Sequence, residues 1–524
     1  MRLSIATLGL ALTACYSTGE GITPPLDRVY FPVGLTTNCD QRAGAPTKCQ
    51  ATRLYVASSD FDLQYNAGSI QAIDLERVHT LLDAVYPNGT TTANCKAADL
   101  GTQTDAEQLL APGPCRGVDL TKADLLVAKV GIGAFASDLI LTTDLSGTHK
   151  RLLLPVRGEA SLHWIDLDNA DNELDCGQTD GSPVCDRAHR VGTDPAENTR
   201  NVRMPSEPYG IAVSAEGDAI AVTHQTLGQL SLFYQEFNGD GTWPDGDNRG
   251  PRLESITTLS STRAVAIAAA PESQYVREKR QAWIESGQTS ADPYPPGFLV
   301  TYADSSQIDL MRFYADTPSS PARPFLQGAA AVPLRANSGG VISRGITLDD
   351  SARRACDERD CAADSGSDGC KACANESVGV YVSSRSPASL LVGATLPGTL
   401  DTYSRDVPQF VDAMPVPLGA SRVYVGKVLN DGNLETRIFV VCFDQRRIAI
   451  YDPKSNRIEG TIITGRGPHA MAFEYSENPP RAMAYVGHFT DSYIGVIDLN
   501  RSNLRTYGKI VMSLAERVAP RASK

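Results

Sequence analysis

The sequence predicts an all-β fold, a seven-bladed β-propeller with long disulfide-stapled loops. Three observations support this prediction: a short phrase recurs along the chain, a β-rich segment follows most of its copies, and helical patterns are sparse. Repeated four-stranded units that cannot bury their faces alone are typical of blades stacked around a central channel. A ring of six or eight blades is the alternative.

The recurring phrase begins with a small residue or proline, continues with one variable residue, and usually has Gly or Ala before an apolar stretch. Five copies follow this pattern: "FPVGLTT", "EPYGIAV", "STRAVAI", "ISRGITL" and "GPHAMAF". Two others, "ASDLILT" and "ASRVYVG", follow it more loosely. We interpret each copy as the start of the innermost strand of a blade. The predicted blades are 32–85, 136–168, 208–237, 262–316, 343–396, 421–464 and 468–514.

Two further segments follow most copies of the phrase. The second is an apolar run such as "RLYVASS" or "RIFVVCF", and the third, such as "SIQAIDL" or "IGVIDLN", often ends in an apolar residue and Asp. Frequent Val, Ile, Tyr and Phe, with Gly, Asn and Asp in the turns, favour short antiparallel strands. We expect "RTYGKIVMSL" or "DRVYFP", near the two ends of the chain, to complete a shared blade, because closing the ring removes an exposed sheet edge.

Three apolar strands contain related four-residue motifs: "YVAS" at Tyr55, "YVSS" at Tyr381 and "YVGH" at Tyr485. These motifs resemble the signature of the YVTN-repeat β-propeller proteins. The resemblance covers most of the mature chain, is strongest in the first and last blades, and weakens between Leu253 and Pro417. It implies an exported seven-bladed propeller but no single chemistry, because propellers host binding, scaffolding and several classes of enzyme.

The N-terminal stretch "MRLSIATLGLALTAC" has the layout of an export signal and is too short to span a bilayer as a permanent helix. Its last residues, Leu12 to Cys15, resemble the lipobox of bacterial lipoproteins, which implies cleavage before Cys15 and a lipid anchor on that cysteine. In such lipoproteins an Asp after the cysteine favours the inner membrane; Tyr16 stands here and favours the outer membrane. The alternative is an ordinary signal peptide with an unrelated cysteine.

These features predict a location in the bacterial cell envelope. They also divide the chain into four parts. We expect a lipoprotein signal peptide over 1–14, a tether over 15–27, a single propeller domain over 28–514 and a C-terminal tail over 515–524.

Eleven cysteines remain after Cys15, and most lie close together in polar inserted loops. An exported location favours disulfides between neighbours. We expect three local pairs and a group of four that could form two more: Cys39 and Cys49, Cys95 and Cys115, Cys176 and Cys185, and Cys356, Cys361, Cys370 and Cys373. The group of four could instead hold zinc as a thiolate site. Cys442 lies in an apolar run and is expected to be a buried free thiol.

The charge balance bears on the partners of the protein. With 48 basic and 61 acidic side chains, a net charge of −13 and no dense Lys/Arg run, nucleic acid is not an expected partner. The common signatures of serine hydrolases, zinc proteases and P-loop nucleotide binding are absent from the sequence. No metal or cofactor is predicted, although the acidic segments 166–175 and 238–248 could hold Ca²⁺ without matching the EF-hand spacing.

The variable residue of each recurring phrase is expected to lie at the mouth of the channel. In chain order these residues are Val33, Asp138, Tyr209, Arg263, Arg344, Arg422 and His469. Guanidinium groups suit carboxylates and phosphates, so the ring predicts a site for a small anionic ligand. The candidate ligand-binding residues are Tyr209, Arg263, Arg344, Arg422 and His469. In the alternative, the arginines pair with acidic loops or contact water in the channel.

The ends of the second segments form another predicted ring. Its members are Ser58, Val156, His224, Tyr302, Ser384, Phe443 and His488. His224 and His488, together with His469, could form a metal site or supply a general base. Structural roles are the favoured interpretation, because the third and seventh blades lie far apart around the ring.

The predicted function is that of a non-enzymatic cell-envelope lipoprotein, anchored to the membrane through Cys15. Its propeller would bind an envelope protein or a small anionic ligand, and no catalytic residue is assigned. The alternative is an exported enzyme that uses the channel mouth, either a hydrolase acting on an anionic substrate or a quinone- or metal-dependent oxidoreductase.

Overall fold

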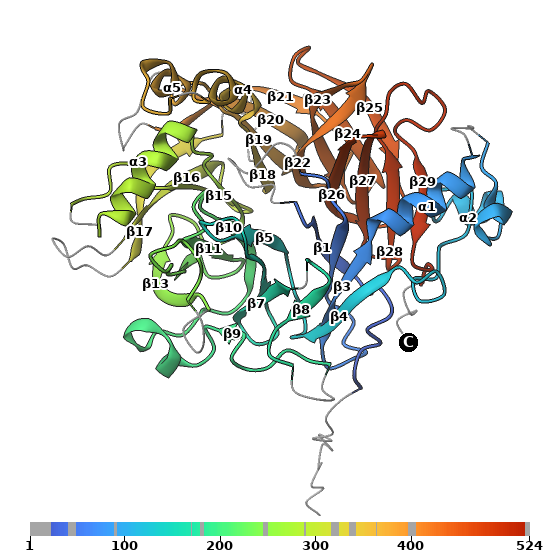
Figure 1. The fold of residues 1–524 in the computed structure, drawn as a ribbon, viewed down its shortest axis with the longest axis horizontal. Helices are drawn as coiled ribbons and strands as arrows, with labels where there is room; N and C mark the ends of the chain where they lie inside the picture. Colours follow the sequence, from blue (N-terminus) through green and yellow to red (C-terminus); the bar gives the residue numbers. More distant parts are fainter. Residues whose placement is uncertain are drawn as a thin grey trace, which may run out of the picture.

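The computed structural model contains seven β-sheets arranged as the blades of a ring (Figure 1). The structure describes residues 22–39, 49–87, 92–168, 170–178, 183–244, 250–287, 290–315, 324–334, 342–362, 364–396 and 405–518. Neighbouring strands within each sheet are antiparallel, and they follow one another in sequence order from the axis outward. The predicted all-β seven-bladed propeller is confirmed.

The first three blades occupy the N-terminal half of the chain. Blade 1 consists of β1 (Pro32–Thr37), β2 (Arg53–Ser58), β3 (Gly68–Asp74) and β4 (Leu126–Ile132). Blade 2 consists of β5 (Ile140–Thr143), β6 (Lys150–Val156), β7 (Ser161–Asp168), β8 (Glu173–Asp175) and β9 (Arg190–Val191), the last two both paired with β7. Blade 3 consists of β10 (Pro208–Val213), β11 (Ala219–His224), β12 (Gln229–Tyr234) and β13 (Arg252–Thr258).

The remaining four blades complete the ring. Blade 4 consists of β14 (Ala264–Ala269), β15 (Gly297–Tyr302), β16 (Gln307–Tyr314) and β17 (Phe325–Pro333). Blade 5 consists of β18 (Ser343–Asp349), β19 (Gly379–Arg385), β20 (Ala388–Thr395) and β21 (Pro408–Pro415). Blade 6 consists of β22 (Ala420–Asn430), β23 (Asn433–Cys442), β24 (Arg447–Asp452) and β25 (Arg457–Ile463). Blade 7 consists of β26 (Pro468–Glu477), β27 (Pro480–His488), β28 (Tyr493–Asp498) and β29 (Ile510–Leu514).

Helices occur in the connections between strands. They are α1 (Leu75–Val85), η2 (Cys95–Ala98), α2 (Asp105–Gln108), η3 (Pro195–Glu197), η4 (Thr199–Asn201), α3 (Gln274–Glu285), α4 (Ser351–Asp360) and α5 (Asp368–Cys373). The side chain of Asp74 accepts a hydrogen bond from the backbone N–H of Arg77, so α1 begins directly where β3 ends. None of the helices in the described ranges is both long and apolar enough to cross a membrane.

Seven apolar clusters form the core, one between each pair of neighbouring blades, including blades 7 and 1. In β2, Leu54 and Val56 pack toward blade 7, whereas Tyr55 and Ala57 pack toward blade 2. Side chains alternate between the two faces of a strand. Both faces of a blade are therefore buried, which explains why the second strands are apolar without interruption.

Glycine in the recurring phrase is explained by the close approach of inner strands. A Cβ atom at Gly34 would lie 2.5 Å from the Cβ of Leu139 in the next blade. A Cβ atom at Gly345 would lie 3.0 Å from the Cα of Arg422. Because neighbouring blades are closest near the axis, a small residue is needed there.

The structure corrects two details of the predicted blades. All seven predicted starts lie within four residues of an inner strand, but five predicted blades end too early. The sequence analysis missed six outer strands, of which all but β8 follow long insertions: β4, β8, β9, β13, β17 and β21. The C-terminal segment "RTYGKIVMSL" completes a blade as predicted, because β29 is the outer strand of blade 7. The two ends of the chain do not share a blade, since β1 belongs to blade 1. Packing between these two blades closes the ring.

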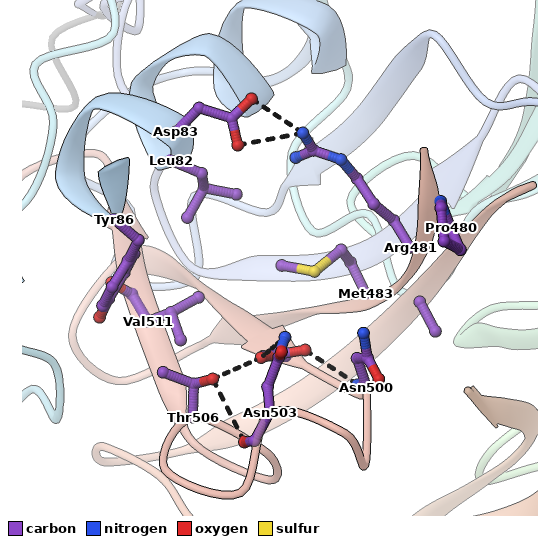
Figure 2. Close-up of a pocket in the computed structure, with 12 residues that line it drawn as sticks. Leu82, Asp83, Tyr86, Pro480, Arg481, Met483, Asn500, Asn503, Thr506 and Val511 are labelled. Carbon is purple, nitrogen blue, oxygen red and sulfur yellow. Dashed lines mark hydrogen bonds and ion pairs between the residues drawn. The ribbon is translucent and has the colours of Figure 1, made fainter. Parts of the chain in front are cut away.

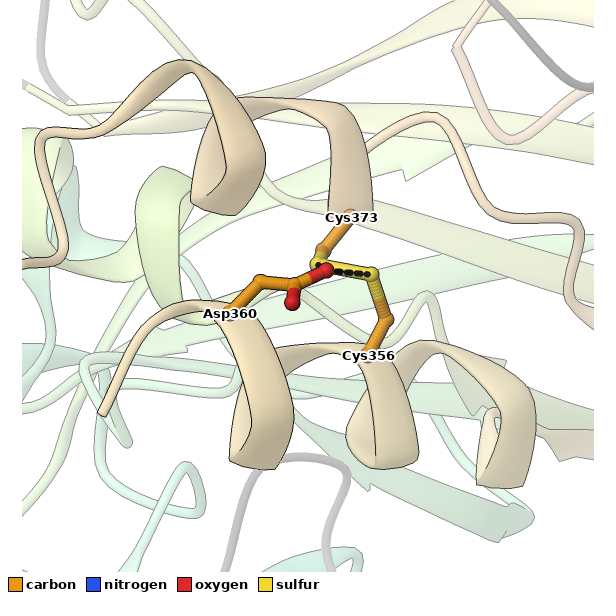
Figure 3. Close-up of side chains that lie close together, drawn as sticks. All are labelled: Cys356, Asp360 and Cys373. Atoms are coloured by element: carbon orange, nitrogen blue, oxygen red, sulfur yellow. Dashed lines mark hydrogen bonds between the residues drawn. A yellow bond between two sulfur atoms is a disulfide. The ribbon is translucent and has the colours of Figure 1, made fainter. Parts of the chain in front are cut away.

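The predicted cysteine pairs occur as disulfides. They are Cys39–Cys49, Cys95–Cys115, Cys176–Cys185, Cys356–Cys373 and Cys361–Cys370. The group of four joins α4 to α5, and Figure 3 shows Asp360 beside the Cys356–Cys373 bond. Cysteines joined in disulfides have no thiolate with which to bind zinc. This arrangement therefore does not agree with the alternative of a zinc site. Cys442 is free and buried, and burial raises the pKa of its thiol to about 12.

Candidate functional site

Each inner strand is irregular close to the variable residue of the recurring phrase. In six blades the antiparallel register shifts there, for example between Pro32 and Gly34 in β1. In blade 2, the bridge between Ala136 and Val156 is out of register with the ladder of β5 and β6. A β-bulge leaves a residue unpaired and re-aims its side chain. Four variable residues lie within the shifts, namely Val33, Tyr209, Arg344 and His469. Arg263 instead precedes the shift in β14, and Arg422 follows the shift in β22 and is paired with Val441.

An ion pair crosses the mouth of the channel. Nη1 of Arg422 in blade 6 lies 2.8 Å from Oδ1 of Asp138 in blade 2, and Nη2 donates to the carbonyl oxygen of Ser137 at 2.9 Å. Both side chains are mostly buried, with 15% and 24% exposed. Burial alone would lower the pKa of Arg422, but Asp138 raises it well above its ordinary value. Arg422 is therefore charged, and the pair ties opposite sides of the ring together.

Two further arginines lie on one side of this ion pair, in blades 4 and 5. Burial lowers the pKa of Arg344, and the nearby charges of Arg263 and Arg385 act in the same direction. No carboxylate of the described residues forms an ion pair with Arg263 or Arg344, and Nε of Arg344 is buried without a hydrogen-bond partner. The side chain of Tyr209 lies near both Arg344 and Arg422. This side of the mouth is therefore cationic.

Carboxylates near these arginines have other partners. Asp444 binds Arg385 through both oxygens, at 2.9 and 3.0 Å. Asp304 accepts hydrogen bonds from the hydroxyls of Ser261 and Thr262. Although burial raises the pKa of Asp304, these hydrogen bonds lower it overall. Neither carboxylate forms an ion pair with Arg263 or Arg344 within the described part of the chain.

Five phenylalanines gather on the other side of the mouth. The mouth phenylalanines are Phe31, Phe61, Phe135, Phe443 and Phe489. The ring centroid of Phe489 lies 5.1 Å from that of Phe31, 5.2 Å from that of Phe61 and 5.8 Å from that of His469. Burial, followed by the charge of Arg422, holds the pKa of His469 well below its usual range. His469 is therefore neutral at pH 7.

The two other histidines singled out from the sequence have structural roles. Nδ1 of His224 lies 2.9 Å from the carbonyl oxygen of Ser206, and Nε2 lies 2.8 Å from Oγ of Ser231. His488 stacks on Tyr493 with ring centroids 4.0 Å apart, and its Nε2 accepts from the backbone N–H of Gly465. Burial lowers the pKa of His224 to about 4 and that of His488 to about 3. Both are neutral parts of the blade interior.

Charge effects thus link the five candidate ligand-binding residues: Tyr209 and Arg263 act on Arg344, Tyr209 acts on Arg422, and Arg422 acts on His469. Val33, in the same ring, packs in the core between blades 1 and 2 and adds no polar group. The sequence analysis missed the mouth phenylalanines as a group. A signal was present, because Phe443 and Phe489 each directly follow the end of a second strand.

Another hollow lies on the outer side of blade 7, next to α1 (Figure 2). Its volume is about 190 Å³, and Arg481 spans one side of it, with Nη2 at 2.8 and 3.0 Å from the two oxygens of Asp83. Asp498 accepts hydrogen bonds from Asn503 and Thr506. Arg481, Asp83 and Asp498 therefore all have partners among the residues that line this hollow.

Acidic residues of the first predicted Ca²⁺ loop have basic partners. Asp166 pairs with Arg151 at 2.6 Å, and Asp171 pairs with Lys150 at 2.6 Å. Residues 245–248 of the second predicted Ca²⁺ loop lie outside the described residues.

Comparisons with known proteins support no assignment to a family. No protein-family model matches the sequence, and no curated protein matches it. Among solved structures, Kuenenia stuttgartiensis hydrazine synthase is 8% identical with a TM-score of 0.45, over 92% of this chain and 99% of that one. The periplasmic gluconolactonase of Pseudomonas aeruginosa is 12% identical with a TM-score of 0.43, over 83% and 86%. Saccharomyces cerevisiae Sqt1 is 10% identical with a TM-score of 0.42, over 96% and 92%. Likeness at this level carries no argument about function.

Proposed function

We propose that this chain is a lipid-anchored protein of the bacterial cell envelope whose propeller binds a small anionic ligand at the mouth of its channel, without transforming it. The observation that carries the proposal is the pair Arg263 and Arg344: Arg263 lies close enough for its charge to lower the pKa of Arg344, and neither side chain forms an ion pair with a carboxylate of the described residues. The protein as a whole has a net charge of −13, so acidic partners are abundant elsewhere. A carboxylate or phosphate would supply the missing partner.

The proposed location depends on the N-terminal segment, which lies outside the described residues. Leu12 to Cys15 resembles a lipobox, and the YVTN-like motifs are those of exported propellers. The five disulfides agree with an oxidising compartment. Replacing Cys15 by Ala should move the protein from the membrane fraction to the soluble fraction. Retention of the variant in the membrane fraction would contradict a lipid anchor at this position.

Binding is favoured over hydrolysis by the state of the titratable groups at the mouth. His469 is a weak base, because burial and Arg422 lower its pKa. Asp138, a carboxylate at the mouth, is paired with Arg422. A general base needs a pKa near the working pH and an accessible lone pair.

The test compares two double variants that remove the same charge. Arg263→Ala/Arg344→Ala removes the cationic side of the mouth, whereas Arg457→Ala/Arg505→Ala removes two exposed arginines from the outer parts of blades 6 and 7. Calorimetric titration with propionate, phosphate and citrate measures anion binding. Since hydrogen bonds to charged groups contribute about 1.5–3 kcal/mol each, we expect the mouth variant to lose about 100-fold in affinity. Equal binding by the mouth variant and the wild type would refute the proposal.

A further inference from the structure

The Arg422–Asp138 ion pair divides the channel mouth into two unlike sides. Blades 7 and 1 lie between its ends on one side, and blades 3, 4 and 5 lie between them on the other. The first side holds His469 and most of the mouth phenylalanines. The second side holds Tyr209, Arg263 and Arg344. The aromatic residues and the cationic residues thus belong to blades on opposite sides of the Arg422–Asp138 ion pair.

The aromatic side presents apolar surface to solvent. Phe61 is 51% exposed, and Leu63, two residues further on, is 64% exposed. The ring of Phe61 meets those of Phe489 and Phe135 edge-on, with interplanar angles of 70° and 87°. Aromatic pairs favour such tilted contacts, and another ring could join them in the same way. Single exposed apolar residues are ordinary, but a joined group at the mouth of a channel indicates a binding surface.

The histidine on the aromatic side, His469, carries no charge that would oppose the binding of an apolar ring. His469 is neutral at pH 7, because burial and Arg422 hold its pKa low. An apolar ring placed beside His469 and Phe489 would therefore displace no charged group. Asp60, which precedes Phe61, has 2% of its surface exposed, and burial raises the pKa of its carboxyl to about 6.

The cationic side has donors that lack acceptors. Nε of Arg344 is buried without a hydrogen-bond partner, and an unsatisfied buried donor is unfavourable. Arg263 is exposed and lies close enough to act on the pKa of Arg344. One anionic group held between these two side chains would satisfy the donor and relieve the repulsion between the guanidinium groups.

We propose that the ligand is a small aromatic carboxylate whose ring and carboxylate are separated by a short chain; this inference depends on the proposed function. The ring lies against Phe61 and Phe489, and the carboxylate binds Arg263 and Arg344. The ligand spans the Arg422–Asp138 ion pair, which is why a linker between ring and carboxylate is required. The binding is non-covalent.

The experiment uses three probes on the full chain carrying Cys15→Ala, which takes no lipid. They are 3-phenylpropionate, which has both groups, propionate, which has only the anion, and 3-phenylpropanol, which has only the ring. Isothermal titration calorimetry gives each Kd. We expect 3-phenylpropionate to bind at least about tenfold more tightly than propionate, since burial of one ring contributes more than 1.4 kcal/mol. We also expect it to bind more tightly than 3-phenylpropanol.

Variants show which residues account for binding of the aromatic ring and which account for binding of the carboxylate. Phe61→Ala should abolish most of the advantage of 3-phenylpropionate and leave propionate binding unchanged, whereas Phe325→Ala, a control in the outer strand β17, should change neither. If Phe61→Ala alone has little effect, Phe489→Leu tests the second ring, because it removes the aromatic ring and keeps an apolar side chain. Arg263→Ala/Arg344→Ala should weaken both anions.

The outcomes separate the two proposals. If propionate and 3-phenylpropionate bind equally well and both require the arginines, the aromatic inference is wrong and the anion site stands. If Phe61→Ala and Phe489→Leu both leave the preference for 3-phenylpropionate intact, the aromatic inference is also wrong. If neither anion binds, or if binding is indifferent to the arginines, both proposals fail.

Discussion

The Arg422–Asp138 ion pair gives the sharpest prediction about the ring itself. The two residues are 284 positions apart in sequence and belong to blades on opposite sides of the channel. They can meet only if the blades close around one axis. We therefore propose a double-mutant cycle with Arg422→Met, Asp138→Asn and the combination of the two.

The size of the effect follows from the contacts. Arg422 donates to Asp138 at 2.8 Å and to the carbonyl oxygen of Ser137 at 2.9 Å, with only 15% of its side chain exposed. A charge-assisted hydrogen bond contributes about 1.5–3 kcal/mol, so each single substitution should lower the free energy of unfolding by about 2 kcal/mol. The double variant should lose less than the sum, by a coupling energy of about 1–2 kcal/mol.

The assay is equilibrium unfolding in urea, followed by circular dichroism with the disulfides intact. Because the pair is mostly buried, the coupling energy should change little between 0.05 and 0.5 M NaCl, unlike that of an exposed pair. The pair Arg385–Asp444, with both side chains more than 40% exposed, is the matched control and should couple by less than about 1 kcal/mol. Additive losses at Arg422 and Asp138 would refute the contact across the mouth.

Three further predictions concern other parts of the molecule. Burial raises the pKa of Asp60 to about 6, above the value of about 3.9 in an unfolded chain, so its ionisation opposes folding at high pH and not below pH 4. Asp60→Asn should therefore raise the free energy of unfolding by up to about 3 kcal/mol above pH 6, with no gain below pH 4; a constant gain across the range would contradict this reasoning. Arg280→Ala leaves three buried carboxylates without their cation and should cost about 3–5 kcal/mol in a urea titration; a loss under 1 kcal/mol would contradict the network. Cys95→Ala/Cys115→Ala opens a loop with a sequence separation of 20 and should lower stability by about 3 kcal/mol by the same assay; an unchanged midpoint would show that the loop is ordered without the bond.

The inner parts of the blades could be predicted from sequence because their constraints are local. The second strands are buried on both faces and read as apolar runs, and the inner strands need a small residue such as Gly34 or Gly345 where neighbouring blades approach. The outer strands could not be predicted in the same way. Strands β4 and β13 are partly exposed and follow long insertions, so neither burial nor spacing marks them.

Helix α3 was not predicted, although a helix-start signal precedes it in the sequence. Ser273 caps α3 by accepting from the backbone N–H of Val276, a pattern that is typical of helix starts. The sequence analysis included this segment in the predicted blade 262–316 and assigned no helix to it. Trp283 and Arg280, buried on the inner face of the helix, anchor it to the blades.

The candidate site could be predicted only in part. The repeat predicted that Arg263, Arg344 and Arg422 lie near one end of the channel, but it did not give their exact positions, since Arg263 precedes the register shift of its inner strand, Arg344 lies within it and Arg422 follows it. Which of them would meet a carboxylate depended on the diameter of the channel and on rotamers, which no sequence pattern encodes. Loops from different blades supply the mouth phenylalanines, and only the closed ring brings these loops together.

The most direct test of a divided mouth is a crystal structure with 3-(4-bromophenyl)propionate, located by the anomalous signal of bromine. We expect a bromine peak beside Phe61 and Phe489, with the carboxylate within hydrogen-bonding distance of Arg263 or Arg344. A peak elsewhere, such as the hollow next to Arg481, or a carboxylate directed away from both arginines, would contradict the binding site proposed here.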